Sequence, residues 1–325
     1  IFLSLRMIDY LYCFDKNYNI QAYCSLFSLL ECSSEKINVH ILHNEPESFK
    51  EIYNLVNNHD KLNKINFYEF DNTGINFPKL DESHVSEATY YRIFIEKYLP
   101  RNLKNIVYID ADIICQNDPT DHIKESLQEL ENSDSIISAR TEHYKNIENQ
   151  NIYERLLMTN EKYFNAGVML IDINKWRENN LTHVLIKKMN DIEELIEFWD
   201  QDILNHYFDG KYNELNKNLN YNLYLTEENS KLQASNKSLN EMIFLHYSGS
   251  YKPWTVRGVY NRKSVFYHLV YRKLFSEKFH ITTTWRAGSL LQFFKGILNL
   301  DFLYLKNKIS FIKITMKTIF KKYEN

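Results

Sequence analysis

Two carboxylates stand one residue apart in the middle of the chain, directly after an apolar segment. Asp110 and Asp112 follow residues 105–109, which are rich in the β-branched side chains of a strand buried on both faces. Ligands of open α/β sheets bind beyond the carboxyl ends of the strands, so both side chains are expected at the mouth of a crevice. Two hard oxygen ligands at this spacing suit a divalent cation, and a bound cation in turn suits a phosphate.

Asp-x-Asp is a weak motif by itself, because aspartate is common at strand ends and turns for reasons of local hydrogen bonding. An EF-hand loop needs further oxygen ligands and a glycine at its sixth position, where this chain has Cys115. A phosphatase of the haloacid dehalogenase type carries the motif close to its first strand, whereas Asp110 lies a third of the way along this chain. Neither of these two kinds of site fits the sequence.

A distant imidazole can complete the ligand set. His246 ends the apolar segment 241–246 and, like the two aspartates, belongs to the end of an expected strand. Two carboxylates and one imidazole favour Mn²⁺, or Mg²⁺ with waters and phosphate oxygens completing six positions. Because only an unprotonated imidazole binds a metal, we expect activity to fall steeply on acidification and to be partly restored by added Mn²⁺.

Strand patterns and helix patterns alternate over the first two thirds of the chain, which predicts an α/β fold with a parallel sheet. We expect strands at residues 8–14, 38–42, 65–70, 105–109, 135–139, 163–173 and 241–246. We expect helices at residues 20–30, 47–56, 86–98 and 121–130, and one capped by Asn174. Gly167 weakens the packing of its strand, and the close approach of another group is one reason to tolerate it there.

The composition bounds the class of protein. The 325 residues are 44% hydrophobic and include 24 Tyr and 20 Phe, so the chain can bury a substantial core. A net charge of −3 argues against nucleic acid as a partner. The cysteines form no Cys-x-x-Cys pair and indicate buried thiols in a reducing, cytoplasmic compartment. They are Cys13, Cys24, Cys32 and Cys115.

Several separated motifs resemble, in type and order, those of the retaining glycosyltransferases of family 8. That group holds bacterial lipopolysaccharide galactosyl- and glucosyltransferases and, more distantly, glycogenin. The resemblance covers about residues 8–254. Its motifs are Phe-Asp-Lys-Asn-Tyr at 14–18, Ala-Thr-Tyr-Tyr-Arg at 88–92, Val-Tyr-Ile-Asp-Ala-Asp at 107–112, Phe-Asn-Ala-Gly-Val at 164–168, Asp-Gln-Asp-Ile-Leu-Asn at 200–205 and His-x-x-Gly-x-x-Lys-Pro-Trp at 246–254.

The resemblance implies a GT-A fold, which is a Rossmann-like mixed α/β sheet flanked by helices. It implies UDP-galactose or UDP-glucose as the donor, retention of the anomeric configuration, and Mn²⁺ bound by Asp110, Asp112 and His246. It also implies a catalytic group made of Asp200, Gln201 and Asp202, with Gln201 near the anomeric carbon. The donor-binding residues that it implies are Asp15, Asn17, Tyr18, Arg92, Asp110, Ala111, Asp112, Asn165, Ala166, Gly249 and Lys252.

The acceptor that the resemblance implies is a hydroxyl of a saccharide or glycolipid, such as lipopolysaccharide core or another surface glycan. The family offers no settled covalent intermediate, so we expect the acceptor to attack from the face that the nucleotide leaves. Two alternatives stay open. The first is a catalytically inactive protein that binds nucleotide sugar or glycan, and the second is a phosphotransferase or phosphatase with Asp110 as its nucleophile.

The composition changes after residue 293, where seven lysines lie between residues 295 and 325. We expect a catalytic domain at residues 7–275 and a basic, helical tail at 276–325. Such a helix can lie on an anionic membrane at its cytoplasmic face, or dock on its own domain with a solvated lysine face. The apolar residues at helical spacing in this tail are Ile309, Ile312, Met316, Ile319 and Phe320.

Overall fold

The computed structural model describes residues 7–50, 52–78, 86–225, 241–282 and 286–320. Its strands are β1 Asp9–Cys13, β2 Ile37–His43, β3 Leu62–Glu69, β4 Asn105–Ile109, β5 Ile113–Cys115, β6 Ile137–Tyr144, β7 Lys162–Asp172, β8 Asn213–Glu214, β9 Tyr221–Asn222 and β10 Phe244–His246. Its α-helices are α1 Asn19–Cys32, α2 Pro46–Lys50, α3 Asn54–Asn57, α4 Ile95–Tyr98, α5 Thr120–Glu131, α6 Gln150–Arg155, α7 Ile173–Glu178, α8 Leu181–Asp191, α9 Trp199–Phe208, α12 Val256–Tyr260, α13 Val265–Leu274, α14 Arg286–Leu298 and α15 Lys308–Phe320. Short 3-10 helices include η1 Lys16–Tyr18, η2 Glu87–Phe94, η4 Lys217–Leu219 and η6 Asp301–Tyr304.

Seven strands form a mixed sheet in the order β3-β2-β1-β4-β7-β6-β8. The four strands from β3 to β4 are parallel, as the alternating pattern predicted, whereas β7 runs antiparallel to both β4 and β6. The expectation of an entirely parallel sheet was therefore wrong. Only the short helix α6 lies between β6 and β7, and antiparallel neighbours need no long crossover helix. The mixed sheet that the family resemblance implied is confirmed.

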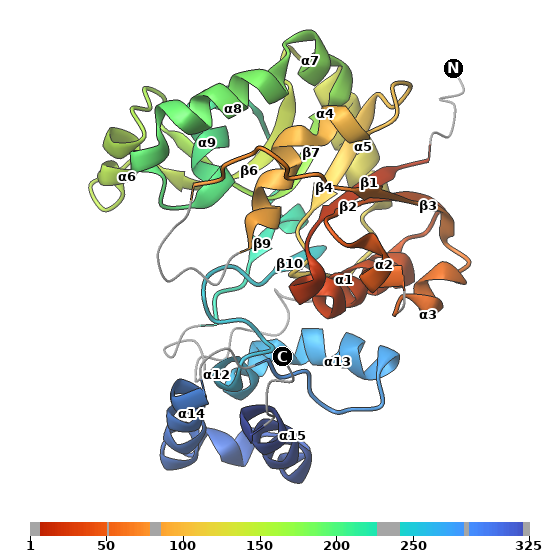
Figure 1. Ribbon diagram of the computed structural model, residues 1–325, viewed down its shortest axis with the longest axis vertical. Coiled ribbons are helices and arrows are strands. Elements are labelled where there is room, and N and C mark those ends of the chain that lie inside the picture. Colours follow the sequence, from red (N-terminus) through yellow and green to blue (C-terminus); the bar gives the residue numbers. More distant parts are fainter. Residues whose placement is uncertain (1–6, 51, 79–85, 226–240, 283–285, 321–325) are drawn as a thin grey trace.

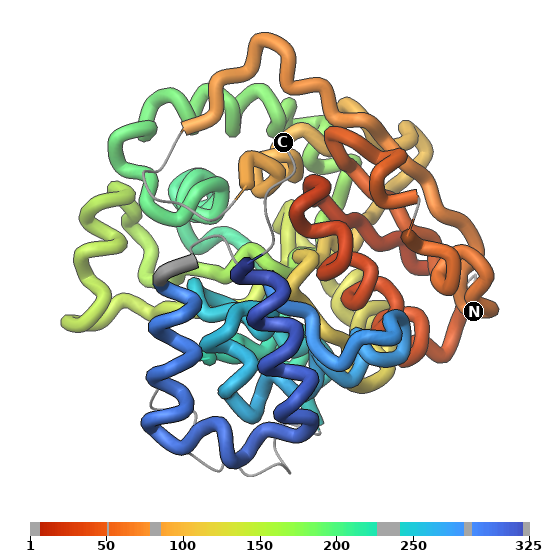
Figure 2. The backbone as a smooth tube through the Cα atoms, turned by 60° about the horizontal axis from the view of Figure 1, so that its bottom comes forward, coloured from red at the N-terminus to blue at the C-terminus, as the bar shows by residue number. Residues whose placement is uncertain are grey.

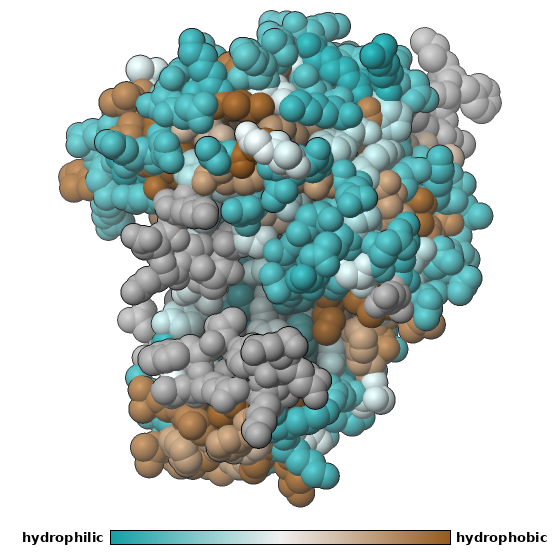
Figure 3. Space-filling view, viewed as in Figure 1, coloured by the Kyte–Doolittle hydropathy of each residue, from teal (hydrophilic) through white to brown (hydrophobic). Residues whose placement is uncertain are grey.

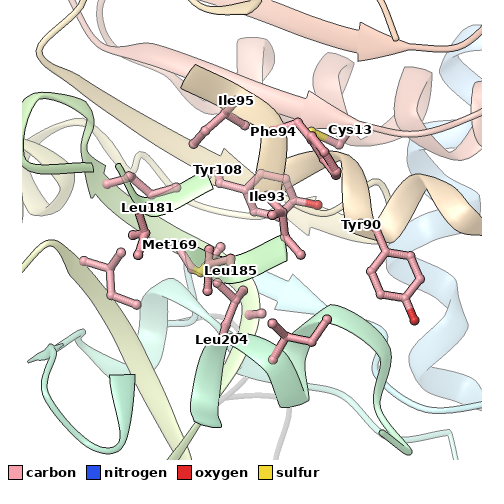
Figure 4. Close-up of a cluster of buried hydrophobic side chains, with 14 of the residues drawn as sticks. Cys13, Tyr90, Ile93, Phe94, Ile95, Tyr108, Met169, Leu181, Leu185 and Leu204 are labelled. Carbon is pink, nitrogen blue, oxygen red and sulfur yellow. The ribbon is translucent and has the colours of Figure 1, made fainter. Parts of the chain in front are cut away.

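Helices cover both faces of this sheet (Figure 1). Alternate residues of the central strand point to opposite faces, so Ile106 and Tyr108 join one core cluster while Val107 and Ile109 join another. The first cluster packs against η2, α4, α7, α8 and α9, and Figure 4 shows part of it around Tyr108. The second packs against α1, α2, α3 and α5. Burial on both faces explains the continuous apolar character of residues 105–109.

A small second sheet lies at the carboxyl end of the large one. Its order is β5-β10-β9, with β10 antiparallel to β5 and parallel to β9. The sequence predicted β10 but not the short strands β5 and β9. In this sheet His246 is paired with Ile113, the residue that follows Asp112. Two segments that are far apart in the chain are thereby brought to one point.

Several local expectations were wrong. The helix expected at 47–56 is split, because α2 ends at Lys50 and α3 begins at Asn54. Asn174 lies within α7, and Asp172 is the residue that caps this helix, accepting a hydrogen bond of 3.0 Å from the backbone N–H of Lys175. The passage expected as loop after residue 139 continues as strand β6 to Tyr144.

The C-terminal helices gather at one end of the molecule (Figures 1 and 2). A hydrophobic cluster there combines Val256 and Tyr260 of α12 with Phe279, Phe293 and Phe311. The buried side chains of α15 are Phe311, Thr315 and Ile319, so Ile319 is the one residue of the expected apolar stripe that is buried. A boundary between two domains at residue 275 stays a prediction. Among the described residues, no helix combines the length and the apolar character that crossing a membrane requires.

Candidate active site

The two aspartates and the distant histidine meet at the carboxyl end of β4. The Nε2 atom of His246 lies 3.3 Å from Asp112 Oδ1 and 3.9 Å from Asp110 Oδ2. One candidate ligand atom from each residue can be chosen so that all lie within 4.8 Å of one another. The backbone holds this geometry, because Asp110 donates its N–H to Gly167 and Tyr247 donates its N–H to the carbonyl of Asp112.

These three residues fit a divalent cation. Asp112 Oδ1 is buried and has no hydrogen-bond partner within the described part of the chain. A buried carboxylate oxygen without a partner is costly, and a bound cation would satisfy it. The donor set of two carboxylates and one imidazole suits Mn²⁺ or Mg²⁺.

Lys252 lies on the far side of Asp112. Its Nζ atom is 2.6 Å from Asp112 Oδ2 and donates a second hydrogen bond of 2.6 Å to the carbonyl of Tyr247. Burial by itself raises the pKa of Asp112, but Lys252 and His246 outweigh it and hold that pKa well below its usual range. Asp112 is therefore a carboxylate, as a metal ligand must be.

Arg92 organises the opposite side of the site and is only 4% exposed. Its guanidinium pairs with Asp110 at 3.0 Å and with Asp200 at 2.8 Å, and donates to the carbonyl of Ala166 at 2.6 Å. It also lies over the ring of Tyr108, 4.1 Å from the centroid. One side chain therefore ties η2 to the end of β4, to β7 and to α9.

Asp200 is buried at the start of α9, where its carboxylate accepts a hydrogen bond from Thr89 Oγ1 and pairs with Arg92. Burial raises the pKa of Asp200 to about 6, although Arg92 and Thr89 act in the opposite direction. The residue before it, Trp199, has a φ of 49°. A bulky residue in the left-handed region is uncommon and often marks a functional site.

Gln201 and Asp202 differ in their position. Gln201 lines the cavity, accepting from the backbone N–H of Ala166 at 3.0 Å and donating to the Tyr163 hydroxyl at 3.1 Å. Asp202 is fully buried and does not line the cavity. Its carboxylate accepts hydrogen bonds from Arg155, Tyr163 and the backbone N–H groups of residues 197 and 198. Those bonds fix the start of α9.

Two loops close the site near the aspartates. Asp15 caps η1 by accepting from the backbone N–H of Asn17, and Tyr18 packs edge-on against Trp254. Gly249 has a φ of 82°, in the left-handed region that favours glycine, so the loop after β10 can turn sharply there. This turn brings the chain back to Lys252.

All of the expected site residues except Asn17 and Asp202 line one cavity of about 530 Å³. Asn17 is exposed beside the cavity. The shared lining residues are Asp15, Tyr18, Arg92, Asp110, Ala111, Asp112, Asn165, Ala166, Asp200, Gln201, His246, Gly249 and Lys252. Residues from six separated motifs thus face one space.

The sequence did not indicate several residues of the cavity wall. Glu142 on β6 accepts hydrogen bonds from Asn165, Asn222 and Tyr224. Phe198 and Trp199 form an apolar part of the same wall. Glu142 lies in the passage expected as loop, so no strand pattern predicted that its side chain would face the cavity. The structure also buries Asn220, which was not expected at the site.

The cysteine expectation holds in part. Cys13, Cys24 and Cys115 are buried, whereas Cys32 is half-buried, and all four are free thiols. Burial raises the pKa of Cys24 and of Cys115. Buried thiols with raised pKa values are unreactive, so they contribute packing.

Comparison with known proteins gives a consistent result. A family model described as glycosyl transferase family 8 matches residues 10–257. The chain is 30% identical over 175 residues to a lipopolysaccharide 1,3-galactosyltransferase of Salmonella typhimurium, covering 53% of this chain and 51% of that protein. It is 27% identical over 251 residues to a lipopolysaccharide 1,2-glucosyltransferase of Escherichia coli, covering 74% and 71%. The structure of the galactosyltransferase LgtC with donor and acceptor sugar analogues shares the fold, with a TM-score of 0.67, 21% identity, and coverage of 87% of this chain and 100% of LgtC.

Proposed function

The chain belongs to glycosyl transferase family 8, and from this we propose that it moves galactose or glucose from a UDP-sugar to a hydroxyl of a saccharide acceptor, with retention of the anomeric configuration. The acceptor we propose is lipopolysaccharide core or another surface glycan, free or attached to a lipid. The relatives that act on lipopolysaccharide support this choice.

One observation carries the proposal. The cavity joins the Asp110, Asp112 and His246 cluster to Lys252 on one side and to Asp200 and Gln201 on the other. Asp110, Asp112 and His246 would hold a divalent cation, which would supply positive charge to a departing diphosphate. Lys252 adds a positive charge beside the same position. A nucleotide diphosphate and a sugar therefore both find suitable partners within one space.

We assign the sugar end of the cavity to the residues around α9. The Asp200 carboxylate and the amide of Asn165 can bind sugar hydroxyls, and Arg92 fixes Asp200 through their ion pair. The amide of Gln201 is the polar group we place near the anomeric carbon. Asp202 lies behind the cavity wall, and we propose that it acts by holding the start of α9.

We propose that the acceptor hydroxyl attacks from the face that the phosphate leaves, with a phosphate oxygen taking the proton. The competing route would use Gln201 or Asp202 as a nucleophile that bonds to the sugar. Hydrogen bonds within the protein already hold both side chains, which supports direct attack by the acceptor. Mass spectrometry of the protein after incubation with donor alone tests it. A hexose attached covalently to either residue would contradict the proposal.

A donor screen tests the proposed activity. We expect UDP release from UDP-galactose or UDP-glucose in the presence of Mn²⁺ and a saccharide acceptor, and loss of that release when a chelator removes the metal. The measurement is UDP released from a panel of UDP-sugars with and without Mn²⁺. Donor binding without turnover of any acceptor would favour an inactive binding protein. A phosphoaspartate on Asp110 that forms without UDP-sugar would favour a phosphotransferase.

The raised pKa of Asp200 predicts that the difference in stability between wild type and Asp200→Asn depends on pH. The native Asp200 takes up a proton at about pH 6, above its ordinary value, so its contribution favours the fold at acidic pH and is lost as the pH rises through 6. Asp200→Asn should therefore be more stable than wild type at about pH 8 and similar at about pH 4. Thermal melts of both proteins at the two pH values measure this.

The same variant should lose most of its transfer activity, because the amide replaces a carboxylate in the cavity. Asp191→Asn, an exposed carboxylate on α8, is the control and should change neither property. An Asp200→Asn protein that is less stable than wild type at every pH would show that the ion pair with Arg92 outweighs burial.

We also propose that the C-terminal helices bind an anionic membrane surface, which for a cytoplasmic enzyme is the inner face of the membrane. Figure 3 shows apolar surface gathered over these helices at one end of the molecule. Exposed lysines such as Lys306 and Lys313 are interspersed in the sequence with the exposed apolar residues of these helices. The exposed apolar residues are Leu291, Phe294, Ile297, Leu298, Leu300, Leu303, Tyr304, Ile309, Ile312 and Phe320.

Vesicle sedimentation tests this surface. We expect binding to vesicles that contain phosphatidylglycerol and little binding to phosphatidylcholine alone, since each lysine near an anionic surface contributes about 1 kcal/mol. Replacing Leu298 and Ile309, each 81% exposed, with serine should weaken binding at least about tenfold. Ile147→Ser is the matched control, because Ile147 is 96% exposed but lies in another part of the chain. Equal binding by all three proteins would contradict the proposal.

A further inference from the structure

We propose that Asn220 is a positioning residue of the metal centre, which holds His246 in the tautomer whose Nε2 atom is free to bind a cation. The inference rests on the proposed function insofar as that function needs a metal. Asn220 belongs to none of the motifs from which the site was expected. It follows η4 and precedes β9, 26 residues before His246.

A backbone N–H group can only donate a hydrogen bond. The N–H of Gly167 donates to Asn165 Oδ1 at 2.9 Å. The same Asn165 oxygen is 3.0 Å from the side-chain nitrogen of Asn220, which must therefore be the donor of that contact. The remaining atom of the Asn220 amide, Oδ1, then faces Nδ1 of His246 at 3.0 Å.

An amide oxygen only accepts hydrogen bonds, so His246 Nδ1 must carry a hydrogen. In a neutral imidazole the other nitrogen, Nε2, then has its lone pair available. Nε2 is the atom that lies 3.3 Å from Asp112 and 3.9 Å from Asp110. A chain of three hydrogen bonds thus sets which nitrogen of His246 faces the candidate cation.

Burial makes these three hydrogen bonds difficult to replace. Asn220 is 0% exposed, and Asn165 and His246 are each 5% exposed, so water has little access to take over a lost hydrogen bond. Gly167 also has a steric role, because a Cβ there would lie 2.3 Å from Cε1 of His246. The imidazole occupies the space that a side chain at position 167 would fill, so its ring cannot move far.

The chain of hydrogen bonds also connects the metal centre to Asn165, which lines the proposed sugar end of the cavity. A change at Asn220 should therefore disturb both ends of the site. The two effects can be separated by chemistry. Asn220→Asp keeps an acceptor for His246 Nδ1 but removes the donor to Asn165, whereas Asn220→Leu removes both.

Mn²⁺ binding, measured by electron paramagnetic resonance of the free ion, tests the proposal without relying on activity. We expect Asn220→Leu to bind Mn²⁺ about 10–100-fold more weakly than wild type, and Asn220→Asp to stay within about threefold. Asn222→Leu is the matched control, because it loses partly buried side-chain amide contacts two residues away that do not involve the imidazole of His246. Thermal melts establish that each variant is folded. Wild-type affinity in Asn220→Leu, or equal losses in Asn220→Leu and Asn220→Asp, would overturn the proposal.

A second readout needs no metal. Long-range ¹H–¹⁵N correlation spectra distinguish the two neutral tautomers of histidine, and the His246 signal is the one that disappears in His246→Gln. For the neutral ring we expect the Nδ1–H form in wild type and in Asn220→Asp. An Nε2–H form in wild type would overturn the inference. If no UDP-sugar is turned over, the proposed function is contradicted, but the tautomer result still stands.

Discussion

Replacing Asp112 with asparagine should lower the rate of sugar transfer by about three orders of magnitude, since one preorganised charge at a reacting centre contributes about that much. Asparagine keeps the shape of the side chain but removes the negative charge. That charge faces His246 at 3.3 Å and Lys252 at 2.6 Å, so its loss affects both the cation site and the lysine beside it. The measurements are UDP release at saturating donor and the dissociation constant for Mn²⁺.

The loss should appear mainly in the rate at saturating donor and in the affinity for Mn²⁺, and should not result from unfolding. The circular dichroism spectrum tests the second point. Asp191→Asn serves again as the control for removal of a carboxylate. If Asp112→Asn keeps activity within about tenfold of wild type, Asp112 does not act at the reacting centre. Undiminished activity of the wild type in chelator would reject the metal altogether.

Replacing Arg92 with methionine should lower the free energy of unfolding by about 3–5 kcal/mol, because it leaves the buried carboxylate of Asp200 without its partner. Arg92 pairs with both Asp110 and Asp200 and also donates to the carbonyl of Ala166. Methionine fills much of the volume of the arginine side chain, so the loss of charge is the dominant change. Urea denaturation followed by tryptophan fluorescence measures the difference.

A double variant separates the charge from the packing. Arg92→Met with Asp200→Asn removes the unpaired carboxylate along with the arginine, so it should recover part of the lost stability. Arg101→Met, at an exposed position, is the control and should change stability by less than about 0.5 kcal/mol. A double variant that is less stable than Arg92→Met would show that Asp200 has other favourable partners that matter more than its burial.

Local sequence patterns predicted most of the regular elements of the catalytic part. Strand β4 was identifiable because it is buried on both faces and therefore continuously apolar. The direction of β7 was not identifiable, since a strand has the same side-chain pattern in a parallel and an antiparallel pair. Strands β8 and β9 consist of two residues each, too short for any periodic pattern.

The candidate site was predictable where chemistry requires a particular residue type in a short motif. Asp110, Asp112 and His246 were expected together, and the structure brings them together. Asp202 was expected at the reacting centre with them, but the structure places it behind the wall with its carboxylate satisfied by hydrogen bonds. The spacing in Asp-Gln-Asp does not say which side chain of a helix faces the cavity.

The sequence by itself determined which chemical groups this protein has and the family to which it belongs, because carboxylates, imidazole and lysine at motif spacings depend only on residue type and order. The tertiary structure alone decided which of those groups share a space. It joined β5 to β10, so that a histidine met two aspartates more than 130 residues away in the chain. It also placed Asn220 against His246 and Glu142 in the wall of the same cavity, because contacts between distant segments arise from packing and leave no local sequence pattern.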